Sequence, residues 1–413
     1  MAVATTSVTD TCRAAQAASR ELAAMSAALK DAALLRVAGA LEERADEILE
    51  ANARDLEAGR ESGLSAALMD RLALDPARIA SIAGAVRSIA ALPDPVGEVI
   101  DGSRLPNGLD VRKVRVPLGV IAVVYEARPN VTVDAAALCL KSGNAIVLRG
   151  SSSAAHSNAV LASIVAPEFP EGAVSLVAGG REQLAELAGQ EGVVDLIIPR
   201  GGEGLKQALS AVAKVPVIYA ASGNCHVFVD ASADLDRALE IVLNAKTQRP
   251  GVCNAAETLL VHADVAAEFL PRAGSALRDA GVELRAEARA AALLDGSVAA
   301  TEEDFAEEFL ALVLAVKVVD SAEEAIEHVN RYGSGHSEAI VTGSAAAARA
   351  FQLRVDAACV YVNASTRFTD GGEFGMGAEI GNSTQKLHAR GPIGLRELCT
   401  FKYLVEGDGQ VRP

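Results

Sequence analysis

The stretch KTQRPGVCNAAETLL, residues 246–260, carries a cysteine between a predicted helix and a predicted strand. Residues 235–245 have apolar positions at helical spacing, and the apolar run 258–261 is typical of a strand. The Pro-Gly pair just before Cys253 predicts a turn, which places the thiol on the loop that joins the two elements. Reactive residues concentrate on such loops.

Two cations close to this cysteine in sequence favour a reactive thiol. Positive charge from Lys246 and Arg249 would lower the pKa of the Cys253 thiol from its free value of about 8.5. The resulting thiolate is the form that attacks carbonyl carbon. The alternative interpretation is a buried, inert cysteine, because Cys is among the most buried residue types.

Composition excludes several classes of function. The chain has 413 residues and a formal net charge of −16, so its field repels nucleic acid and anionic membrane surfaces. Its length predicts two large domains. The six cysteines form no CxxC pair, so neither a metal site nor a disulfide framework is expected. With no signal-peptide pattern and no run of about 18 apolar residues, we expect a cytoplasmic protein.

The distribution of apolar runs predicts an α/β fold with two domains. Alternation of strands and helices indicates βαβ units and parallel sheets. The predicted strands lie at residues 120–125, 145–148, 174–177, 194–198 and 215–219, and then at 258–261, 312–319, 339–341 and 359–362. Helices are predicted over 12–58, with Leu34, Ala38, Leu41, Ala45 and Ile48 as its buried stripe, and over 76–91, 235–245, 322–330 and 345–354. Residues 98–116 read as a hairpin arm and 395–405 as a turn followed by an edge strand.

Three stretches together resemble the gamma-glutamyl phosphate reductases, acylating members of the aldehyde dehydrogenase superfamily. They are residues 246–260, GNCHVFVD at 223–230, and RFTDGGEFGMGAEIGNSTQKLHARGPIGL at 367–395. The resemblance implies an aldehyde dehydrogenase-like fold of two α/β domains with parallel sheets and a small oligomerisation hairpin and tail. It implies an NADPH-binding domain at 1–225 with the arm at about 98–116, a catalytic domain at 226–365, and a substrate loop and oligomerisation tail at 366–413.

The resemblance also implies a reaction, the NADPH-dependent reduction of L-glutamyl 5-phosphate to L-glutamate 5-semialdehyde and phosphate in proline biosynthesis. Cys253 matches the nucleophile of the family and Asn130 its oxyanion donor. From the residues alone, Asn130 could equally be a helix N-cap, where Asn is favoured. Ala221 stands where oxidising relatives carry a glutamate base, so slow hydrolysis of a thioester is expected.

The resemblance assigns cofactor-binding positions at two predicted strand ends and at one residue later in the chain. Arg149, with Ser151, suits the 2′-phosphate of NADPH, although a surface Arg beside a Ser-capped helix would give the same pattern. Gly201 and Gly202 form a Gly-rich turn, which alone is weak support for a phosphate site. Glu308 matches the residue that holds the nicotinamide ribose, or it belongs to a charged helix end.

Four cations are candidates for binding the anionic substrate in an acidic chain, namely Arg128, Arg367, Lys386 and Arg390. The last three lie in a Gly-rich stretch that could instead be a flexible linker. The resemblance further implies a homo-oligomer and a complex with glutamate 5-kinase. An oxidising aldehyde dehydrogenase and a non-catalytic cofactor-binding scaffold remain as alternative functions.

Overall fold

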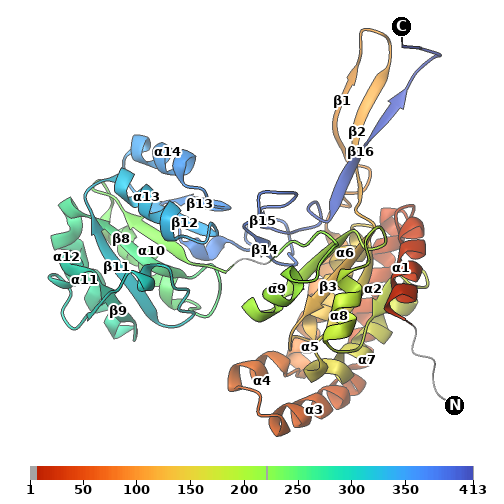
Figure 1. Cartoon of the computed structure of the whole chain (residues 1–413), viewed down its shortest axis with the longest axis horizontal. Helices are drawn as coiled ribbons and strands as arrows, with labels where there is room; N and C mark the ends of the chain where they lie inside the picture. Colours follow the sequence, from red (N-terminus) through yellow and green to blue (C-terminus); the bar gives the residue numbers. More distant parts are fainter. Residues whose placement is uncertain (1–6, 220–221, 413) are drawn as a thin grey trace. The chain divides into compact units, whose positions relative to one another are not determined.

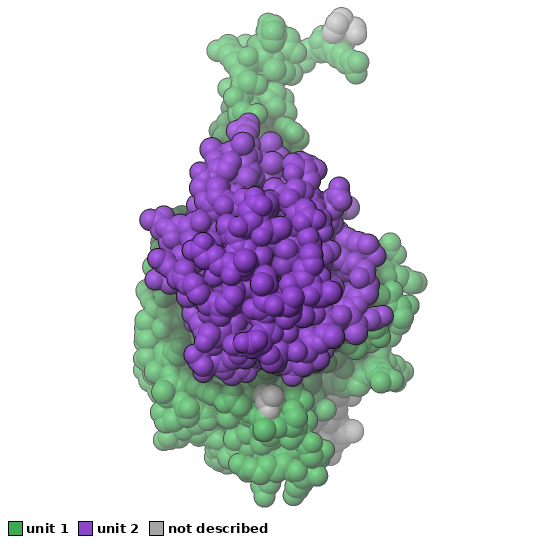
Figure 2. Space-filling view, turned by 90° about the vertical axis from the view of Figure 1, so that its left-hand side faces the viewer, with its two compact units in different colours: residues 1–219, 375–381, 393–413 green, residues 220–374, 382–392 purple. Residues whose placement is uncertain are grey.

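The structure is a computed structural model that describes residues 7–219 and 222–412. The chain folds into two compact units, coloured separately in Figure 2. The first contains residues 1–219, 375–381 and 393–413, and the second contains 220–374 and 382–392. The segment 366–413 contributes residues to both units. The domain bounds expected from the resemblance, 1–225, 226–365 and 366–413, stay a prediction.

Five helices open the first unit (Figure 1): α1 (Val8–Leu22), α2 (Ala27–Glu43), α3 (Ala45–Glu61), α4 (Ala66–Leu72) and α5 (Pro76–Ala91). The single helical stretch predicted for 12–58 is thus wrong, because the chain breaks at two points. The Ser26 hydroxyl caps α2 by accepting from the Leu29 N–H, and Arg44 leaves helical geometry between α2 and α3. Leu34 and Leu41 are fully buried on α2, as the apolar stripe predicted.

A parallel sheet of four strands, in the order β5-β4-β3-β6, forms the centre of the first unit. Its strands are β3 (Val120–Tyr125), β4 (Ala145–Gly150), β5 (Val174–Leu176) and β6 (Leu196–Arg200). They alternate with α6 (Asn130–Lys141), η1 (Ser152–Ala154), α7 (Ala155–Val165), η2 (Ala166–Glu168), α8 (Arg181–Ala188) and α9 (Glu203–Ser210). The strand predicted at 215–219 is reduced to one bridge, from Val217 to Ile197. Pro216 lacks the N–H that a longer ladder needs.

The predicted hairpin arm is confirmed and gains a third strand. Strands β1 (Val99–Arg104), β2 (Asp110–Pro117) and β16 (Cys399–Glu406) form an antiparallel sheet in the order β1-β2-β16. The predicted tail is confirmed as an edge strand. Every residue of β1 is exposed, and so are most residues of β16.

Seven parallel strands form the sheet of the second unit, in the order β10-β9-β11-β8-β7-β12-β13. They are β7 (Cys225–Val229), β8 (Ala256–His262), β9 (Glu283–Ala286), β10 (Val298–Ala299), β11 (Val313–Val319), β12 (Ser337–Val341) and β13 (Cys359–Val362). The remaining elements are α10 (Leu235–Thr247), α11 (Ala263–Asp279), α12 (Ala288–Ala291), η3 (Glu303–Phe305), α13 (Ala322–Tyr332), α14 (Ala345–Arg354), η4 (Thr366–Phe368), β14 (Asn382–Ser383) and β15 (Gly391–Pro392).

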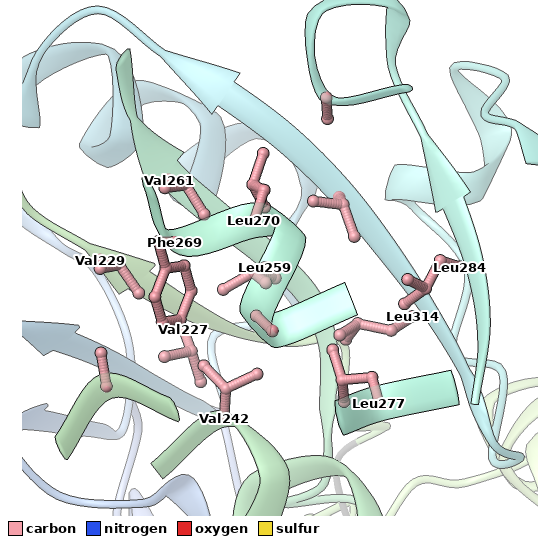
Figure 3. Close-up of a cluster of buried hydrophobic side chains, with 14 of the residues drawn as sticks. Val227, Val229, Val242, Leu259, Val261, Phe269, Leu270, Leu277, Leu284 and Leu314 are labelled. Carbon is pink, nitrogen blue, oxygen red and sulfur yellow. The ribbon is translucent and has the colours of Figure 1, made fainter. Parts of the chain in front are cut away.

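Successive residues of these strands pack into two different cores, because side chains alternate between the faces of a sheet. Val227, Leu259 and Val261 join the core that includes α10 and α11, drawn in Figure 3. Phe228 and Leu260 belong instead to the core that includes α13 and α14. Burial on both faces explains the uninterrupted apolar runs, and it confirms the predicted α/β class. Among the described helices, none is long and apolar enough to cross a membrane.

Candidate active site

Cys253 lies at the amino-terminal edge of the second sheet, on the loop between α10 and β8. Its side chain is partly exposed, whereas the other five cysteines are buried. The sequence-based placement of this thiol on an element-joining loop is therefore confirmed. A fully buried, inert cysteine is not what the structure contains at this position.

Residues just before and at the start of β7 approach the backbone carbonyl of Cys253. An ideal Cβ built on Gly223 would lie 1.5 Å from the Cys253 carbonyl oxygen, so only glycine fits this close approach. The Cys225 thiol lies 3.1 Å from the same oxygen and donates to it. Burial raises the pKa of the Cys225 thiol well above its usual value, so it stays protonated and remains a donor. Gly223 and Cys225 together fix the peptide that carries the nucleophile.

Two carboxylates of the second unit, Glu308 and Glu257, each accept hydrogen bonds. Glu308 accepts from the Gly223 N–H at 2.6 Å, and burial raises the pKa of its carboxyl group. It follows η3 on an extended loop, so the interpretation of Glu308 as part of a charged helix end is wrong. Glu257 is fully buried and accepts from Lys246, which is also fully buried. Burial raises the pKa of Glu257 to about 7, against the opposing effect of Lys246.

The segment that contains Arg367 is bound to the loop that contains Cys253. The Asn254 side-chain amide donates to the carbonyl oxygens of Arg367 at 3.2 Å and Thr369 at 2.9 Å. The Thr366 hydroxyl donates back to the Asn254 carbonyl at 2.7 Å. These bonds place Arg367 beside the nucleophile and show that this part of the Gly-rich stretch is ordered against β8, which is not the behaviour of a flexible linker.

Lys386 and Arg390 form a separate cluster around one carboxylate. Lys386 Nζ lies 2.6 Å from Asp356 Oδ2, and Arg390 Nη2 lies 2.9 Å from Asp356 Oδ1. Hydrogen bonds from Lys386 and then Arg390 lower the pKa of Asp356. The Asp356 carboxylate therefore partly compensates the positive charge that Lys386 and Arg390 bring to the Gly-rich stretch.

In the first unit, candidate residues meet at the carboxyl-terminal edge of the sheet. The loops after β3, β4 and β6 leave neighbouring strands, and they carry Arg128 and Asn130, Arg149 and Ser151, and Gly201 and Gly202. The strand order reverses direction between β3 and β6, because the chain continues from β3 to β4 on one side and from β6 to the Val217 bridge on the other. Ligands of open α/β sheets bind at such switch points.

Asn130 is the first residue of α6 and is not its cap. Pro129 occupies the N-cap position, and no side chain caps this helix end. The Asn130 amide nitrogen instead donates to Asp134 Oδ2 at 2.9 Å. Burial raises the pKa of Asp134 to about 6, while the bond from Asn130 and the charge of Arg200 oppose that rise. Because a carboxylate oxygen only accepts, this bond fixes which end of the amide carries the N–H groups.

The strand end after β4 is fixed by hydrogen bonds to its neighbours. Arg149 Nη2 donates to the carbonyl oxygens of Gly179 at 3.2 Å and Gly180 at 2.9 Å. Its Nε is buried and has no partner in the described chain. The Ser151 hydroxyl accepts from the Ala127 N–H at 3.0 Å and bonds to Ser153 Oγ at 2.6 Å.

The turn after β6 presents N–H groups to a negatively charged oxygen. Gly202 caps α9, and its N–H donates to Glu126 Oε2 at 3.1 Å. A Cβ on Gly201 would lie 2.7 Å from that same oxygen. An anion at a helix N-terminus is favourable, and here the Glu126 carboxylate holds that place. The Glu126 carboxylate and the buried, unpartnered Nε of Arg149 thus lie at the carboxyl-terminal edge of the same sheet.

The sequence matches the Aldehyde dehydrogenase family over residues 2–293 and 291–402, and the chain belongs to that family. It is therefore an oxidoreductase of the family, which implies a nicotinamide cofactor.

The curated relatives include "Gamma-glutamyl phosphate reductase" of Thermobifida fusca, 58% identical over 96% of this chain and 97% of that protein. The protein of the same name from Moorella thermoacetica is 57% identical over 96% and 97%. A crystal structure of gamma-glutamyl phosphate reductase from Thermotoga maritima has a TM-score of 0.97 and 47% identity over 99% of this chain and 100% of that one. These relatives confirm the resemblance that the three sequence stretches indicated.

Sequence reasoning missed the structural role of Gly223, Cys225 and Asn254. The close approach of Gly223 to Cys253 joins residues 30 positions apart, and no local pattern reports it. The quoted motif at 223–230 was the available signal, since its Gly precedes a strand whose first residue is Cys225. Ala221, assigned from the resemblance as the missing base, lies outside the described residues.

Proposed function

We propose that this chain catalyses the NADPH-dependent reduction of L-glutamyl 5-phosphate to L-glutamate 5-semialdehyde and phosphate. The observation that carries the proposal is the partly exposed Cys253, whose peptide is held by Gly223 and Cys225. Relatives at 58% and 57% identity bear the name of this reductase, which supports the choice of substrate.

In the proposed reaction, the Cys253 thiolate attacks the acyl carbon and phosphate leaves. The Asn130 amide and the Cys253 backbone N–H stabilise the oxyanion, as preorganised donors do. When bound, NADPH supplies the hydride that reduces the thioacyl group. The Cys253 thiolate then departs and releases the aldehyde. The Cys225 thiol holds the Cys253 carbonyl, which belongs to the peptide that follows the nucleophile.

For the cofactor, we propose that Gly201 and Gly202 face the pyrophosphate and that Arg149 and Ser151 face the adenosine ribose. Arg149 favours NADPH over NADH, because a guanidinium binds a phosphate through two hydrogen bonds. Its Nη2 is held by two backbone carbonyls, so the group is preorganised. Glu308 would hold the nicotinamide ribose with the carboxylate that Gly223 orients.

For the substrate, we propose that Arg128, Arg367, Lys386 and Arg390 supply the positive charge that the acidic chain otherwise lacks. Arg367 is the member of this set bound to the nucleophile loop. Lys386 and Arg390 share Asp356, so their contribution is expected to be smaller.

The arm is proposed to mediate formation of a homo-oligomer. Large apolar side chains are exposed along β16, with Phe401 at 46%, Tyr403 at 60% and Val405 at 55%. Substituting Tyr403 and Val405 by Lys should lower the molecular mass in light scattering. The complex with glutamate 5-kinase stays a prediction of the resemblance.

One assay separates the proposed reductase from its alternatives. The reaction is run in reverse with glutamate semialdehyde and NADP, and the reduced nicotinamide is followed by absorbance with and without phosphate. Phosphate-dependent reduction supports the proposal. Reduction that needs no phosphate would indicate an oxidising aldehyde dehydrogenase, and no reduction would indicate a binding protein without catalysis.

A further inference from the structure

Two arginines near Cys253 form no ion pair within the described side chains of the second unit. Arg249 precedes the nucleophile on the same loop, and Arg367 is tied to that loop through Asn254. The ion pairs of that unit join other cations to its Asp and Glu residues. By contrast, most surface arginines of the chain pair with a carboxylate, as Arg237 does with Asp234 at 3.5 Å.

A hydrogen bond holds Arg367 against the residue that precedes Arg249, and the two guanidinium groups lie close enough to repel each other. Arg367 Nε donates to Gln248 Oε1 at 2.8 Å, and Gln248 is the chain neighbour of Arg249. Burial lowers the pKa of Arg367, and repulsion by Arg249 lowers it further, while Cys253 and Asp370 oppose the effect. Two like charges held together raise the energy of an empty site, and an anion that both can bind removes that cost.

The position of Arg249 and Arg367 near Cys253 indicates which anion the two arginines bind. Cys253 follows the C-terminal end of α10, where the helix dipole is negative, so positive charge must come from side chains. In acyl transfer from an acyl phosphate, the leaving oxygen sits on the carbon that the thiol attacks. The phosphoryl group must therefore lie next to Cys253 when the bond breaks.

We propose that Arg249 and Arg367 form the phosphate subsite, which binds the phosphoryl group of the acyl phosphate and holds the phosphate that leaves. This inference rests on the proposed reductase function. As the Cys253 sulfur–carbon bond forms, the carbon–oxygen bond to phosphate breaks, and the electron pair stays on the phosphate oxygen. The proton lost by the thiol is regained by the phosphate from water. The two guanidinium groups stabilise the charge that develops on that oxygen.

Inorganic phosphate is the probe, because it is the co-substrate of the reverse reaction. Arg249→Gln and Arg367→Gln should each raise the KM for phosphate about 10- to 100-fold, the range for a lost charge-assisted hydrogen bond. The KM for the semialdehyde should stay within about twofold in the same variants. Arg249→Lys should recover only part of the loss, since an ammonium cannot bind phosphate through two parallel bonds. Arg237→Gln, which removes the same charge from a surface ion pair, is the matched control.

A second measurement needs no turnover. Alkylation of Cys253 by iodoacetamide, followed by peptide mass spectrometry, should be slowed by phosphate in the wild type and not in Arg249→Gln or Arg367→Gln. An unchanged phosphate KM together with unchanged protection would overturn the subsite. A rise in the semialdehyde KM alone would overturn it too, because the arginines would then bind the substrate carboxylate. If wild-type activity needed no phosphate, the reductase function would fail, and the protection assay would still decide phosphate binding.

Discussion

The two parallel sheets of this chain carry their candidate residues at opposite edges. In the first unit, Asn130, Arg149 and Gly201 follow β3, β4 and β6, at the carboxyl-terminal edge. In the second unit, Cys225 begins β7 and Cys253 precedes β8, at the amino-terminal edge. The first arrangement follows the general rule for ligand binding to open α/β sheets, and the second departs from it.

The difference teaches how each site is held in place. At the carboxyl-terminal edge, helix N-termini and strand ends present N–H groups to anions, as Gly202 does to Glu126. At the amino-terminal edge, Cys253 follows the C-terminal end of α10, so the N-terminus of that helix does not face the thiol. The position of Cys253 depends instead on two close contacts to its carbonyl, from Gly223 and Cys225. Substitutions should therefore affect turnover in the second unit mainly through the geometry of one peptide.

The largest expected effect comes from removing the nucleophile at the amino-terminal edge. Cys253→Ala should lower kcat by at least about 10⁴-fold, because removal of a nucleophile leaves only the contribution of binding and oxyanion stabilisation. Binding of NADP, measured by fluorescence titration, should be unchanged. Cys359→Ala is the control, since that cysteine is buried at the start of β13. Turnover that survived in Cys253→Ala would rule out the covalent mechanism.

The second largest effect is expected from Asn130, at the carboxyl-terminal edge of the sheet in the first unit. Asn130→Ala should lower kcat by about 10²- to 10³-fold with little change in KM, as expected when one oxyanion donor is lost. Asp134→Asn should produce a smaller loss, because the amide of Asn130 could then turn over. Steady-state kinetics of the two variants separate these roles. Equal activity of Asn130→Ala and the wild type would remove Asn130 from the site.

A third prediction concerns the close approach of Gly223 to the Cys253 carbonyl. Gly223→Ala places a Cβ where the Cys253 carbonyl lies, so one backbone must move. A displacement of about 1 Å can lower turnover by about 10²-fold. Gly251→Ala is the matched control on the same loop, because its Cβ would meet only the Leu310 carbonyl oxygen at 3.7 Å. The rates of Cys253 alkylation and of turnover should fall together in Gly223→Ala, and a loss of similar size in Gly251→Ala would contradict this explanation.

The smallest expected effect distinguishes two roles of the Cys225 side chain, namely donating a hydrogen bond and filling space. Cys225→Ala removes the hydrogen bond to the Cys253 carbonyl and should lower kcat up to about tenfold, in line with the worth of one neutral hydrogen bond. Cys225→Ser keeps a donor and should recover most of the activity, with KM unchanged in both variants. Equal rates for Ala and Ser at this position would show that Cys225 only fills space.

The sequence predicted the parts of the fold that rest on local pattern. The strands at 120–125 and 359–362 and the helices at 76–91 and 345–354 have the predicted bounds, because apolar periodicity and clear end signals agree there. The sequence predicts one continuous helix over 12–58 because Ala suits every helical position, whereas in the structure the Ser26 cap begins a separate helix.

For the site, sequence patterns located single residues but not the contacts between distant ones. Cys253 on the loop before β8 and Asn130 at the start of α6 both lie where a strand and a helix are joined, and such junctions are recognisable in the sequence. The neutralisation of Lys246 by Glu257 and of Lys386 by Asp356 depends on tertiary packing, which makes a cation in the sequence a poor measure of charge in the site. The repulsion between Arg249 and Arg367 depends on tertiary packing as well.

The central claim is that Cys253 forms a covalent acyl enzyme, which phosphate then cleaves. A stopped-flow burst experiment tests this claim most directly. The enzyme is mixed with NADP and excess glutamate semialdehyde in phosphate-free buffer. The amount of reduced nicotinamide formed is then divided by the amount of Cys253 present. We expect a burst of no more than one equivalent of reduced nicotinamide per Cys253, followed by a slow phase that added phosphate makes fast and linear. Rapid multiple turnovers without phosphate, or a burst in Cys253→Ala, would contradict it.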